Sequence, residues 1–290
     1  MDAKIEYSEN TPLAPYTSFR IGGPARLLVF PKSCKEAILS FDILRAEDVR
    51  TLVLGNGTNV LVADEGFDGA AVILSGMRTY AVEGEHITAD AGIPLTKLAS
   101  VAAKESLSGL EFAYGIPGTL GGGIYMNAGA YGGEMSQVVV SSRYYDAATG
   151  ECGIYDGAAH EFAYRHSAYM DSAKIVLSAT MKLTRGDKNA IEAAMADYMS
   201  RRRDKQPLEY PSAGSVFKRG NGFITAQKID EAGLKGRTVG GAQVSEKHAG
   251  FIINKGGATA SDVLELIEII KTEVHEKFAL YIECEVRYIK

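Results

Sequence analysis

Residues 111–134 form the stretch that most constrains how this chain can fold. Eight of them are glycines, interleaved with apolar side chains such as Ile116, Leu120 and Ile124. Glycine among packing residues indicates backbone in conformations that a Cβ forbids, or backbone pressed against another group. The stretch therefore predicts either tight turns with a glycine-containing helix, or bare backbone against a flat polyatomic ligand. Thr119 and Asn127 favour the ligand, because they can address the heteroatoms of a ring system.

A second glycine-rich segment directly follows the apolar run at residues 51–54. It reads Gly55-Asn56-Gly57-Thr58-Asn59. A strand followed by such a turn is how phosphate cradles begin, because successive N–H groups make a concave anion site. Val60 stands where the dinucleotide fingerprint has its third glycine, and no Gly-Lys-Ser/Thr of a Walker A loop follows. For this segment alone, a β-turn between strands is the better explanation.

Composition excludes several classes of protein. Hydrophobic residues make up 46% and charged residues 23% of 290 residues, which is ordinary for a globular chain. A net charge of −5 gives no electrostatic footprint for nucleic acid. Cys34, Cys152 and Cys284 lie too far apart for a metal pair or a disulfide framework. The N-terminus has no apolar signal core, and no apolar run reaches the roughly 18 residues that a membrane span needs.

These exclusions lead us to expect a cytoplasmic protein with no metal, no nucleic-acid partner and no membrane contact. A monomer is the simplest state, although the sequence does not decide it. His160 and His275 lack the second histidine of a zinc-binding helix, so we interpret both as surface residues.

Hydrophobic periodicity predicts both helices and strands. We expect helices over residues 33–47, 94–106, 188–204 and 224–232, and a long one beginning after Thr259. Its apolar stripe contains Val263, Ile267, Ile270, Val274 and Phe278, and Thr259 with Asp262 fits a capping box. Strands are expected over residues 26–30, the first of the chain, and 51–54, 60–62, 70–74, 86–91, 138–145, 174–184, 242–244 and 251–254. The proline-flanked residues 206–212 are the best domain boundary.

Three further segments carry chemically useful side chains. Arg165 lies in a polar loop, Ser215 follows a glycine, and Glu285 shares the face of a predicted strand with Glu283 and Arg287. Each has an ordinary alternative: a surface arginine, a turn serine next to a strand, and a solvent-exposed row of charges. Individually these signals are weak, and their order along the chain is more informative.

That order resembles the UDP-N-acetylenolpyruvoylglucosamine reductase family over residues 10–289. The motifs are Gly-x-Gly-Thr-Asn-Val-Leu-Val, Gly-Ile-Pro-Gly-Thr-x-Gly-Gly with Asn-Ala-Gly-Ala-Tyr-Gly, Tyr-Arg-x-Ser, Ser-Ala-Gly-Ser-Val-Phe-Lys and Glu-Val-Arg. The lack of an insertion between the arginine and serine motifs is similar to the shorter, type II subtype. Thr58 stands where the family commonly has serine.

The resemblance implies an α+β fold with FAD bound by two α+β subdomains of the vanillyl-alcohol-oxidase (PCMH) type. These would be residues 1–75 and 76–205, followed by an α+β substrate-binding domain at 206–290. The FAD-binding residues it implies are Gly55, Asn56, Gly57, Thr58, Asn59, Gly115, Pro117, Gly118, Thr119, Gly122, Asn127 and Gly129.

It also implies NADPH-dependent reduction of UDP-N-acetylglucosamine enolpyruvate to UDP-N-acetylmuramate, a step of peptidoglycan synthesis that serves cell shape and division. NADPH reduces the flavin, whose N5 passes hydride to the enolpyruvyl β-carbon. Arg165 and Glu285 match the residues that stabilise the resulting enediolate, and Glu285 serves best protonated, which a buried apolar site encourages. Ser215 matches the proton donor to the α-carbon.

Arg203, Lys235, His248 and Arg287 fall at positions that contact the UDP-sugar, and His248 stands where the longer subtype has glutamine. The residues alone also allow an oxidase of the same flavin fold, or a nucleotide-binding protein without turnover.

Overall fold

The computed structural model describes residues 5–290, which pack as two compact units. The first contains residues up to Glu9, Leu27–Asn56 and Gly69–Arg201, and the second contains Asn10–Arg26, Gly57–Asp68 and Arg202–Lys290. The boundary expected near Gln206 lies close to the last of these divisions. Residues 10–26 and 57–68 belong with the C-terminal part, so the chain visits the second unit three times. The absence of a signal segment was inferred partly from residues 1–4, which lie outside the described residues.

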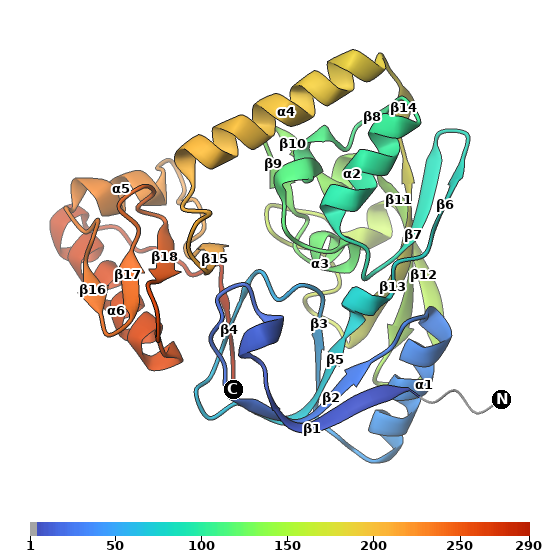
Figure 1. Ribbon diagram of the computed structural model, residues 1–290, viewed down its shortest axis with the longest axis horizontal. Helices are drawn as coiled ribbons and strands as arrows, with labels where there is room; N and C mark the ends of the chain where they lie inside the picture. The colour runs from blue at the N-terminus through green and yellow to red at the C-terminus, as the bar shows by residue number, and fades with distance from the viewer. Residues whose placement is uncertain (1–4) are drawn as a thin grey trace. The chain divides into compact units, whose positions relative to one another are not determined.

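The first unit contains a five-stranded antiparallel sheet (Figure 1). Its order is β12 (Cys152–Asp156), β11 (Val139–Asp146), β13 (Lys174–Lys182), β7 (His86–Asp90) and β6 (Tyr80–Glu83). Helix α3 (Leu120–Tyr125) packs on β7 and β13, and α1 (Cys34–Ala46) also contacts β13. Helices α2 (Leu95–Lys104) and α4 (Lys188–Lys205) complete the helices of this part of the chain. The glycine-rich stretch therefore lies directly against the sheet, through α3.

A second sheet has the order β1 (Glu6–Pro12), β2 (Pro24–Phe30), β5 (Phe67–Ile73) and β3 (Thr51–Leu54). Strands β3 and β5 are parallel. The division between the two units passes along the chain through β1, β2 and β5. The four-residue strand β3 ends at Leu54, so it delivers Gly55 and Asn56 at its carboxyl end.

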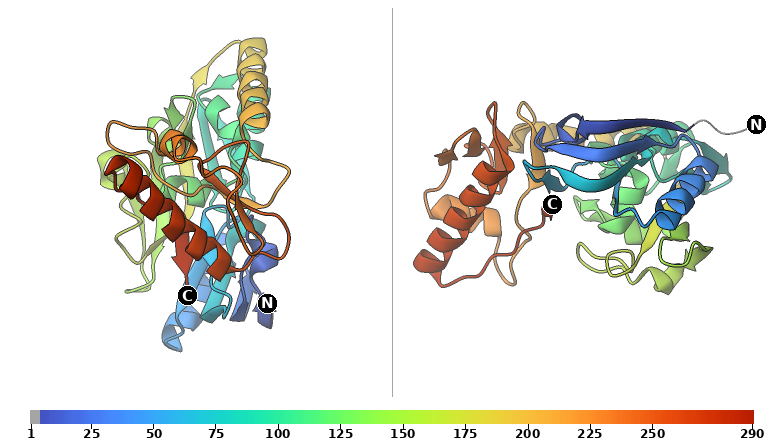
Figure 2. Two further views of the ribbon diagram at one scale, coloured as in Figure 1. Left: turned by 90° about the vertical axis from the view of Figure 1, so that its left-hand side faces the viewer. Right: turned by 90° about the horizontal axis from the view of Figure 1, so that it is seen from below.

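The second unit is built on the sheet β15 (Ser212–Ser215), β18 (Phe251–Asn254), β17 (Ala242–Val244) and β16 (Thr238–Val239). The long helix α6 (Ala260–Phe278) packs on β16 and β17 and is best seen in Figure 2, and the short helix α5 (Thr225–Glu231) contacts it. The predicted apolar stripe of α6 is confirmed, because Val263, Ile267, Ile270 and Val274 are buried. Strand β4 (Val60–Val62) pairs in parallel with β19 (Arg287–Ile289).

The first turn of α6 has its backbone donors satisfied by three side chains. Thr259 and Asp262 form the predicted capping box, in which Thr259 Oγ1 accepts from Asp262 N at 3.0 Å. Asp64, which is distant in sequence, accepts from Ala260 N at 2.7 Å and from Ser261 N at 3.0 Å. Because these amides have no partner within the helix, the carboxylate of Asp64 stabilises α6 and ties residues 57–68 to it.

The first strand and the sheet edges depart from the sequence prediction. We expected the first strand at residues 26–30, but β1 precedes it, and Pro12 is tolerated there because β1 is an edge strand. Strands β6 and β12 were also missed. Both are edges of the five-stranded sheet and have no buried residue, so they lack the alternation of apolar and polar side chains that marks a strand.

Replacing Asp64 by alanine should lower the free energy of unfolding by about 1 kcal/mol, the usual loss for a helix cap. The matched control is Asp68→Ala, because Asp68 is 90% exposed and its ion pair with Arg26 spans 3.9 Å. Urea unfolding monitored by circular dichroism measures both variants. Equal losses would show that Asp64 does not act through the amides of α6.

Candidate active site

The two glycine-rich segments contact each other within the first unit. The side-chain amide of Asn56 donates to Pro117 O at 2.7 Å. A Cβ on Gly55 would overlap Thr119 Oγ1, so only glycine allows this approach. Segments 61 residues apart in the sequence therefore form one surface, which is what a shared ligand requires.

The three consecutive glycines of α3 have different surroundings. A Cβ on Gly121 would lie 2.9 Å from Ala91 Cβ, and one on Gly123 would lie 3.1 Å from Leu95 Cδ1. Gly121 and Gly123 are themselves buried, so both glycines serve close packing. Gly122 is exposed, and the nearest atom to its added Cβ would be Thr119 Oγ1 at 3.6 Å. The packing and ligand interpretations of this stretch therefore apply to different glycines, and Gly122 offers bare, accessible backbone.

Asn127 connects this stretch to the loop that carries Arg165. Its side chain is buried, its Nδ2 donates to Ala163 O at 3.0 Å, and its Oδ1 accepts from Ser136 N at 2.9 Å. The side-chain amide is thus occupied by the protein's own backbone rather than turned to a ring system. A cofactor contact at Asn127 stays a prediction, and it would have to use the main chain.

Arg165 occupies a two-residue turn in a conformation unusual for its residue type. Ala163 and His166 exchange backbone hydrogen bonds of 3.1 Å around Tyr164 and Arg165. The φ angle of Arg165 is 54°, in the left-handed region where glycine is the usual occupant of such a turn. Its Nη2 donates to Gly129 O at 3.2 Å. A non-glycine residue keeps such a conformation only where the surrounding structure imposes it.

Ser215, Glu285 and Asn59 come together within the second unit. Glu285 N donates to Val216 O at 2.7 Å, so the carboxyl and hydroxyl residues lie on paired segments. Asn59 Nδ2 donates to Glu285 O at 3.2 Å, and Arg287 N donates to Asn59 O at 3.1 Å. The strand register shifts between Ser212 and Ser215, where Gly214 has a φ of 77°. Such a bulge re-aims the side chain that follows it.

Glu285 is half-buried, so the strongly apolar surroundings that we expected for it are only partly present. Arg165 belongs to the first unit, and Ser215 and Glu285 belong to the second.

The remaining residues of the predicted phosphate cradle also belong to the second unit. Gly57 has a φ of 57°, and a Cβ there would overlap Tyr16 O. Ser18 N donates to Gly57 O at 3.1 Å. Glycine is thus required at position 57 by the backbone conformation and by the close approach of Tyr16 O, as the β-turn alternative proposed. The neighbouring amides of Thr58 and Asn59 could still form a phosphate cradle.

Of the residues predicted to contact the UDP-sugar, His248 and Lys235 lie close enough to interact. Burial lowers the pKa of His248, and the positive charge of Lys235 lowers it further. His248 Nδ1 accepts from Gly250 N at 3.1 Å, so the neutral ring carries its proton on Nε2. Lys235 pairs with Asp230 at 2.6 Å. Arg203 and Arg287 are exposed.

Comparison with known proteins identifies the family. Residues 206–289 match the C-terminal domain of UDP-N-acetylenolpyruvoylglucosamine reductase, and residues 25–153 match an FAD binding domain. The reductase of Lactobacillus helveticus is 47% identical over 98% of this chain and 95% of its own length, and that of Pediococcus pentosaceus is 46% identical over 99% and 95%. The crystal structure of the Thermus caldophilus reductase superposes with a TM-score of 0.84 at 34% identity, covering 99% of each chain.

The chain belongs to the UDP-N-acetylenolpyruvoylglucosamine reductase family. It is an FAD-dependent oxidoreductase of the α+β, PCMH-type fold, as the sequence predicted. The first unit suits the cofactor, because exposed Gly122 lies beside Thr119, and Thr119 in turn contacts Gly55. Residues 5–290 contain no cluster of three or more His, Cys, Asp or Glu side chains that could hold a metal. No helix in the same range is long and apolar enough to cross a membrane.

The interpretation of His160 as a surface residue is also wrong. His160 is fully buried, and its Nε2 lies 2.7 Å from Ser142 Oγ. Ser142 Oγ in turn lies 2.6 Å from Tyr169 Oη. Sequence reasoning missed all three residues. The available signal was Ser142, a polar residue at an inward position of the strand predicted over 138–145.

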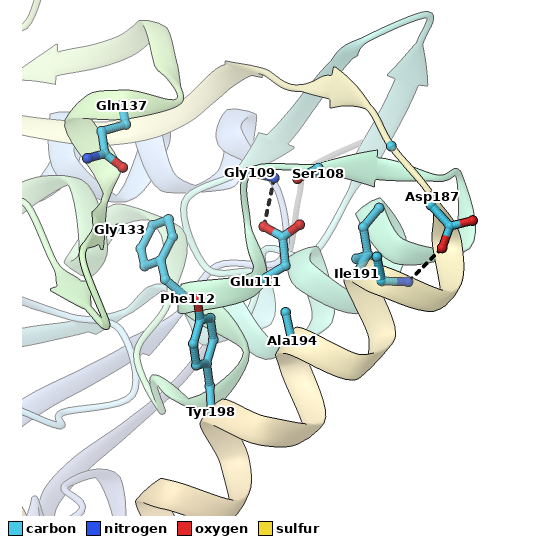
Figure 3. Close-up of a pocket in the computed structure, with 12 residues that line it drawn as sticks. Ser108, Gly109, Glu111, Phe112, Gly133, Gln137, Asp187, Ile191, Ala194 and Tyr198 are labelled. Atoms are coloured by element: carbon cyan, nitrogen blue, oxygen red, sulfur yellow. Dashed lines mark hydrogen bonds between the residues drawn. The ribbon is translucent and has the colours of Figure 1, made fainter.

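A cavity of about 450 Å³ lies elsewhere in the first unit (Figure 3). Phe112, Ile191 and Tyr198 line it, together with small residues of α4 and of the segment around Gly109. Its two carboxylates are held by the chain itself: Glu111 accepts from Gly109 N and Asp187 from Ala190 N, both at 2.8 Å. The predicted site residues lie outside its lining, so this cavity is not the candidate active site.

Alanine substitutions at adjacent glycines of α3 should separate packing from cofactor binding. Gly122→Ala should leave the apoprotein stable but weaken FAD binding at least about tenfold, because a methyl group then covers the exposed backbone. Gly121→Ala should cost about 1–3 kcal/mol of unfolding free energy through overpacking against Ala91. FAD titration of deflavinated protein and urea unfolding measure the two effects. A Gly122→Ala protein with unchanged FAD affinity would contradict this assignment.

Proposed function

We propose that this chain reduces the enolpyruvyl group of UDP-N-acetylglucosamine enolpyruvate to give UDP-N-acetylmuramate, with NADPH as the hydride donor. Family membership and the FAD-binding domain support the reaction class. The observation that carries the proposal is the pairing of the Ser215 and Glu285 segments through Glu285 N and Val216 O. This pairing gives one hydroxyl and one carboxyl group in a single local structure, as protonation of a carbon next to a carboxylate requires.

The reaction adds one hydride and one proton across a carbon–carbon double bond. FAD, held against the exposed backbone of Gly122 beside Thr119, would supply the relay of hydride from NADPH to the β-carbon of the enolpyruvyl group. Negative charge then develops on the carboxylate of that group as an enediolate. Groups that hydrogen-bond to the developing charge lower the barrier most when they are already in place.

We assign that stabilisation to Arg165 and Glu285. The guanidinium group offers a planar fork of donors matched to a carboxylate. Glu285, whose side chain is half-buried, would complement the guanidinium group as a second hydrogen-bond donor in its protonated form.

We assign delivery of the proton to the α-carbon to Ser215. A serine hydroxyl is a weak acid in water, so it must be aligned with the α-carbon before the reaction. A fixed backbone position provides that alignment. Ser215 ends β15, where it pairs with Phe251 of the adjacent strand β18 after the bulge at Gly214. The saturated product then carries one new hydrogen from NADPH and one from the hydroxyl group.

We further propose that Arg203, Lys235, His248 and Arg287 contact the UDP-sugar. Three are cationic and suit a diphosphate. His248, with Nδ1 occupied by Gly250 N, presents Nε2–H as a donor that stays uncharged because burial and Lys235 lower its pKa. From the role of the family, we also propose that the chain acts in the cytoplasm, in peptidoglycan precursor synthesis that supports cell shape and division. We propose FAD-binding subdomains at residues 1–75 and 76–205 and a substrate-binding domain at residues 206–290.

Ser215→Ala tests the central assignment. Removing a general acid typically lowers the rate about 10²-fold or more, so kcat should fall by that factor while FAD content is unchanged. Ser212→Ala at the other end of β15 is the matched control and should keep kcat within about twofold, because it lies outside the proposed machinery. Rates come from NADPH oxidation that depends on the enolpyruvyl sugar, with the product identified by mass spectrometry. A Ser215→Ala enzyme with normal kcat would remove this residue from the mechanism.

A further inference from the structure

The loop that carries Arg165 is closed at its base by buried side chains. His160 and Tyr169 lie at its two ends, and both contact Ser142 Oγ of strand β11, at 2.7 Å and 2.6 Å. The backbone closes the same base, because Ala168 N donates to His160 O at 2.8 Å. All three side chains are at most 1% exposed, so water does not compete for these hydrogen bonds.

The hydrogen bonds at this base run in one direction. His160 Nδ1 lies 3.0 Å from Gly157 O, and a carbonyl oxygen only accepts, so Nδ1 carries a hydrogen. In the neutral ring Nε2 is then an acceptor, Ser142 donates to it, and Tyr169 donates to Ser142. Burial lowers the pKa of His160, which favours this neutral form. We call the ordered series Tyr169–Ser142–His160 the base chain.

Aromatic and charged groups surround the base chain. Phe162 stacks on the His160 ring with centroids 4.9 Å apart. Tyr155 meets the rings of His160 and Tyr169 edge-on, and its hydroxyl accepts from Lys174 Nζ at 2.8 Å. The negative charge of Asp156 opposes burial by raising the pKa of His160. The hydroxyl of Tyr155 therefore lies outside the base chain although its ring packs against it.

The tip of the loop is fixed to the glycine-rich stretch. Ala163 O accepts from Asn127, Ser167 Oγ donates to Tyr125 O at 2.8 Å, and Arg165 donates to Gly129 O. Arg165 at a φ of 54° is disfavoured in isolation, so the base and the tip together must impose its conformation.

We propose that the base chain positions Arg165 for the reduction of the enolpyruvyl group. This inference rests on the proposed function, because it concerns the residue that meets the developing enediolate. Ser142, His160 and Tyr169 are positioning residues that act only through the loop. If His160 is protonated, both ring nitrogens become donors, Ser142 can no longer donate to Nε2, and the order of the base chain is lost. The Arg165 turn then loses its fixed base.

Two variants of the FAD-loaded, full-length protein test the proposal. Ser142→Ala removes the centre of the base chain, and Tyr169→Phe removes only its first donor. Tyr155→Phe is the matched control, since it deletes a neighbouring hydroxyl outside the base chain. Anaerobic stopped-flow absorbance measures two steps separately: reduction of the holoenzyme by NADPH, and its reoxidation by the enolpyruvyl sugar.

In Ser142→Ala, reoxidation by the sugar should slow at least about tenfold, because small displacements of a positioned group cost this much or more. Reduction by NADPH should change less than about twofold. Tyr169→Phe should also slow reoxidation but not reduction, to a smaller degree. It tests the proposal if Ser142→Ala does not fold. Tyr155→Phe should change neither step. Equal slowing of both steps, or no slowing of reoxidation, would overturn the proposal.

A readout independent of turnover is the ¹⁵N signal of His160, assigned by comparison with His160→Gln. The wild-type ring should be the neutral Nδ1–H form at pH 7. Because its pKa is lowered by folding, it should take up a proton only below the ordinary histidine value, and the associated stability is lost as pH falls through that folded pKa. A wild-type Nε2–H or charged ring would overturn the direction of the base chain.

The two proposals fail in distinguishable ways. If the wild-type holoenzyme is not reoxidised by the enolpyruvyl sugar, the proposed function is wrong and this inference falls with it. If the wild type is competent and Ser142→Ala reoxidises normally, the inference alone is wrong.

Discussion

The buried side-chain amide of Asn127 joins two segments of the first unit: the loop that carries Arg165 and the chain that follows the glycine-rich stretch. One end bonds to Ala163 beside the Arg165 turn, and the other bonds to Ser136 beyond the glycine-rich stretch. A buried amide left without partners costs free energy, so these bonds fix the relative positions of the segments. The glycine-rich stretch and the loop of Arg165, which we propose as parts of the cofactor site and the reaction site, are thus held by the same side chain. A displacement of the glycine-rich stretch would therefore displace the Arg165 loop as well.

Glycine has three separate uses in this chain, and they are not interchangeable. Gly121 and Gly123 let α3 approach the core of the first unit, Gly55 admits Thr119, and Gly122 leaves backbone uncovered. Gly57 and Gly214 instead supply positive φ angles next to Asn59 and Ser215. Dense glycine in this sequence therefore reflects close packing and turn geometry as well as the uncovered backbone that we propose for the cofactor.

The elements with strong periodicity were predicted from the sequence, and the residues assigned to the site stay predictions. Helix α6 with its capping box and apolar stripe followed from residues 259–278 alone, because local hydrogen bonds and a buried face both leave a sequence pattern. The edge strands β6 and β12 left no such pattern and were missed. Motif order identified the family, which periodicity could not have done.

Contacts between residues far apart in the sequence were beyond prediction. Nothing local indicates that Asn59 bonds to Glu285, that Asp64 caps α6, or that the Asn127 side chain is turned inward. His160 was assigned to the surface because it lacks the second histidine of a zinc-binding helix, and its partner Ser142 is 18 residues away on a strand. These contacts come from topology, and a single sequence does not encode topology in any short window.

The absorbance spectrum of the purified protein, followed anaerobically, is the decisive test of the proposed reduction. We expect a flavin spectrum that bleaches on addition of NADPH and returns only when UDP-N-acetylglucosamine enolpyruvate is added, with UDP-N-acetylmuramate as the product. A colourless protein that takes up no FAD, or a bleached one that the enolpyruvyl sugar does not restore, would contradict it.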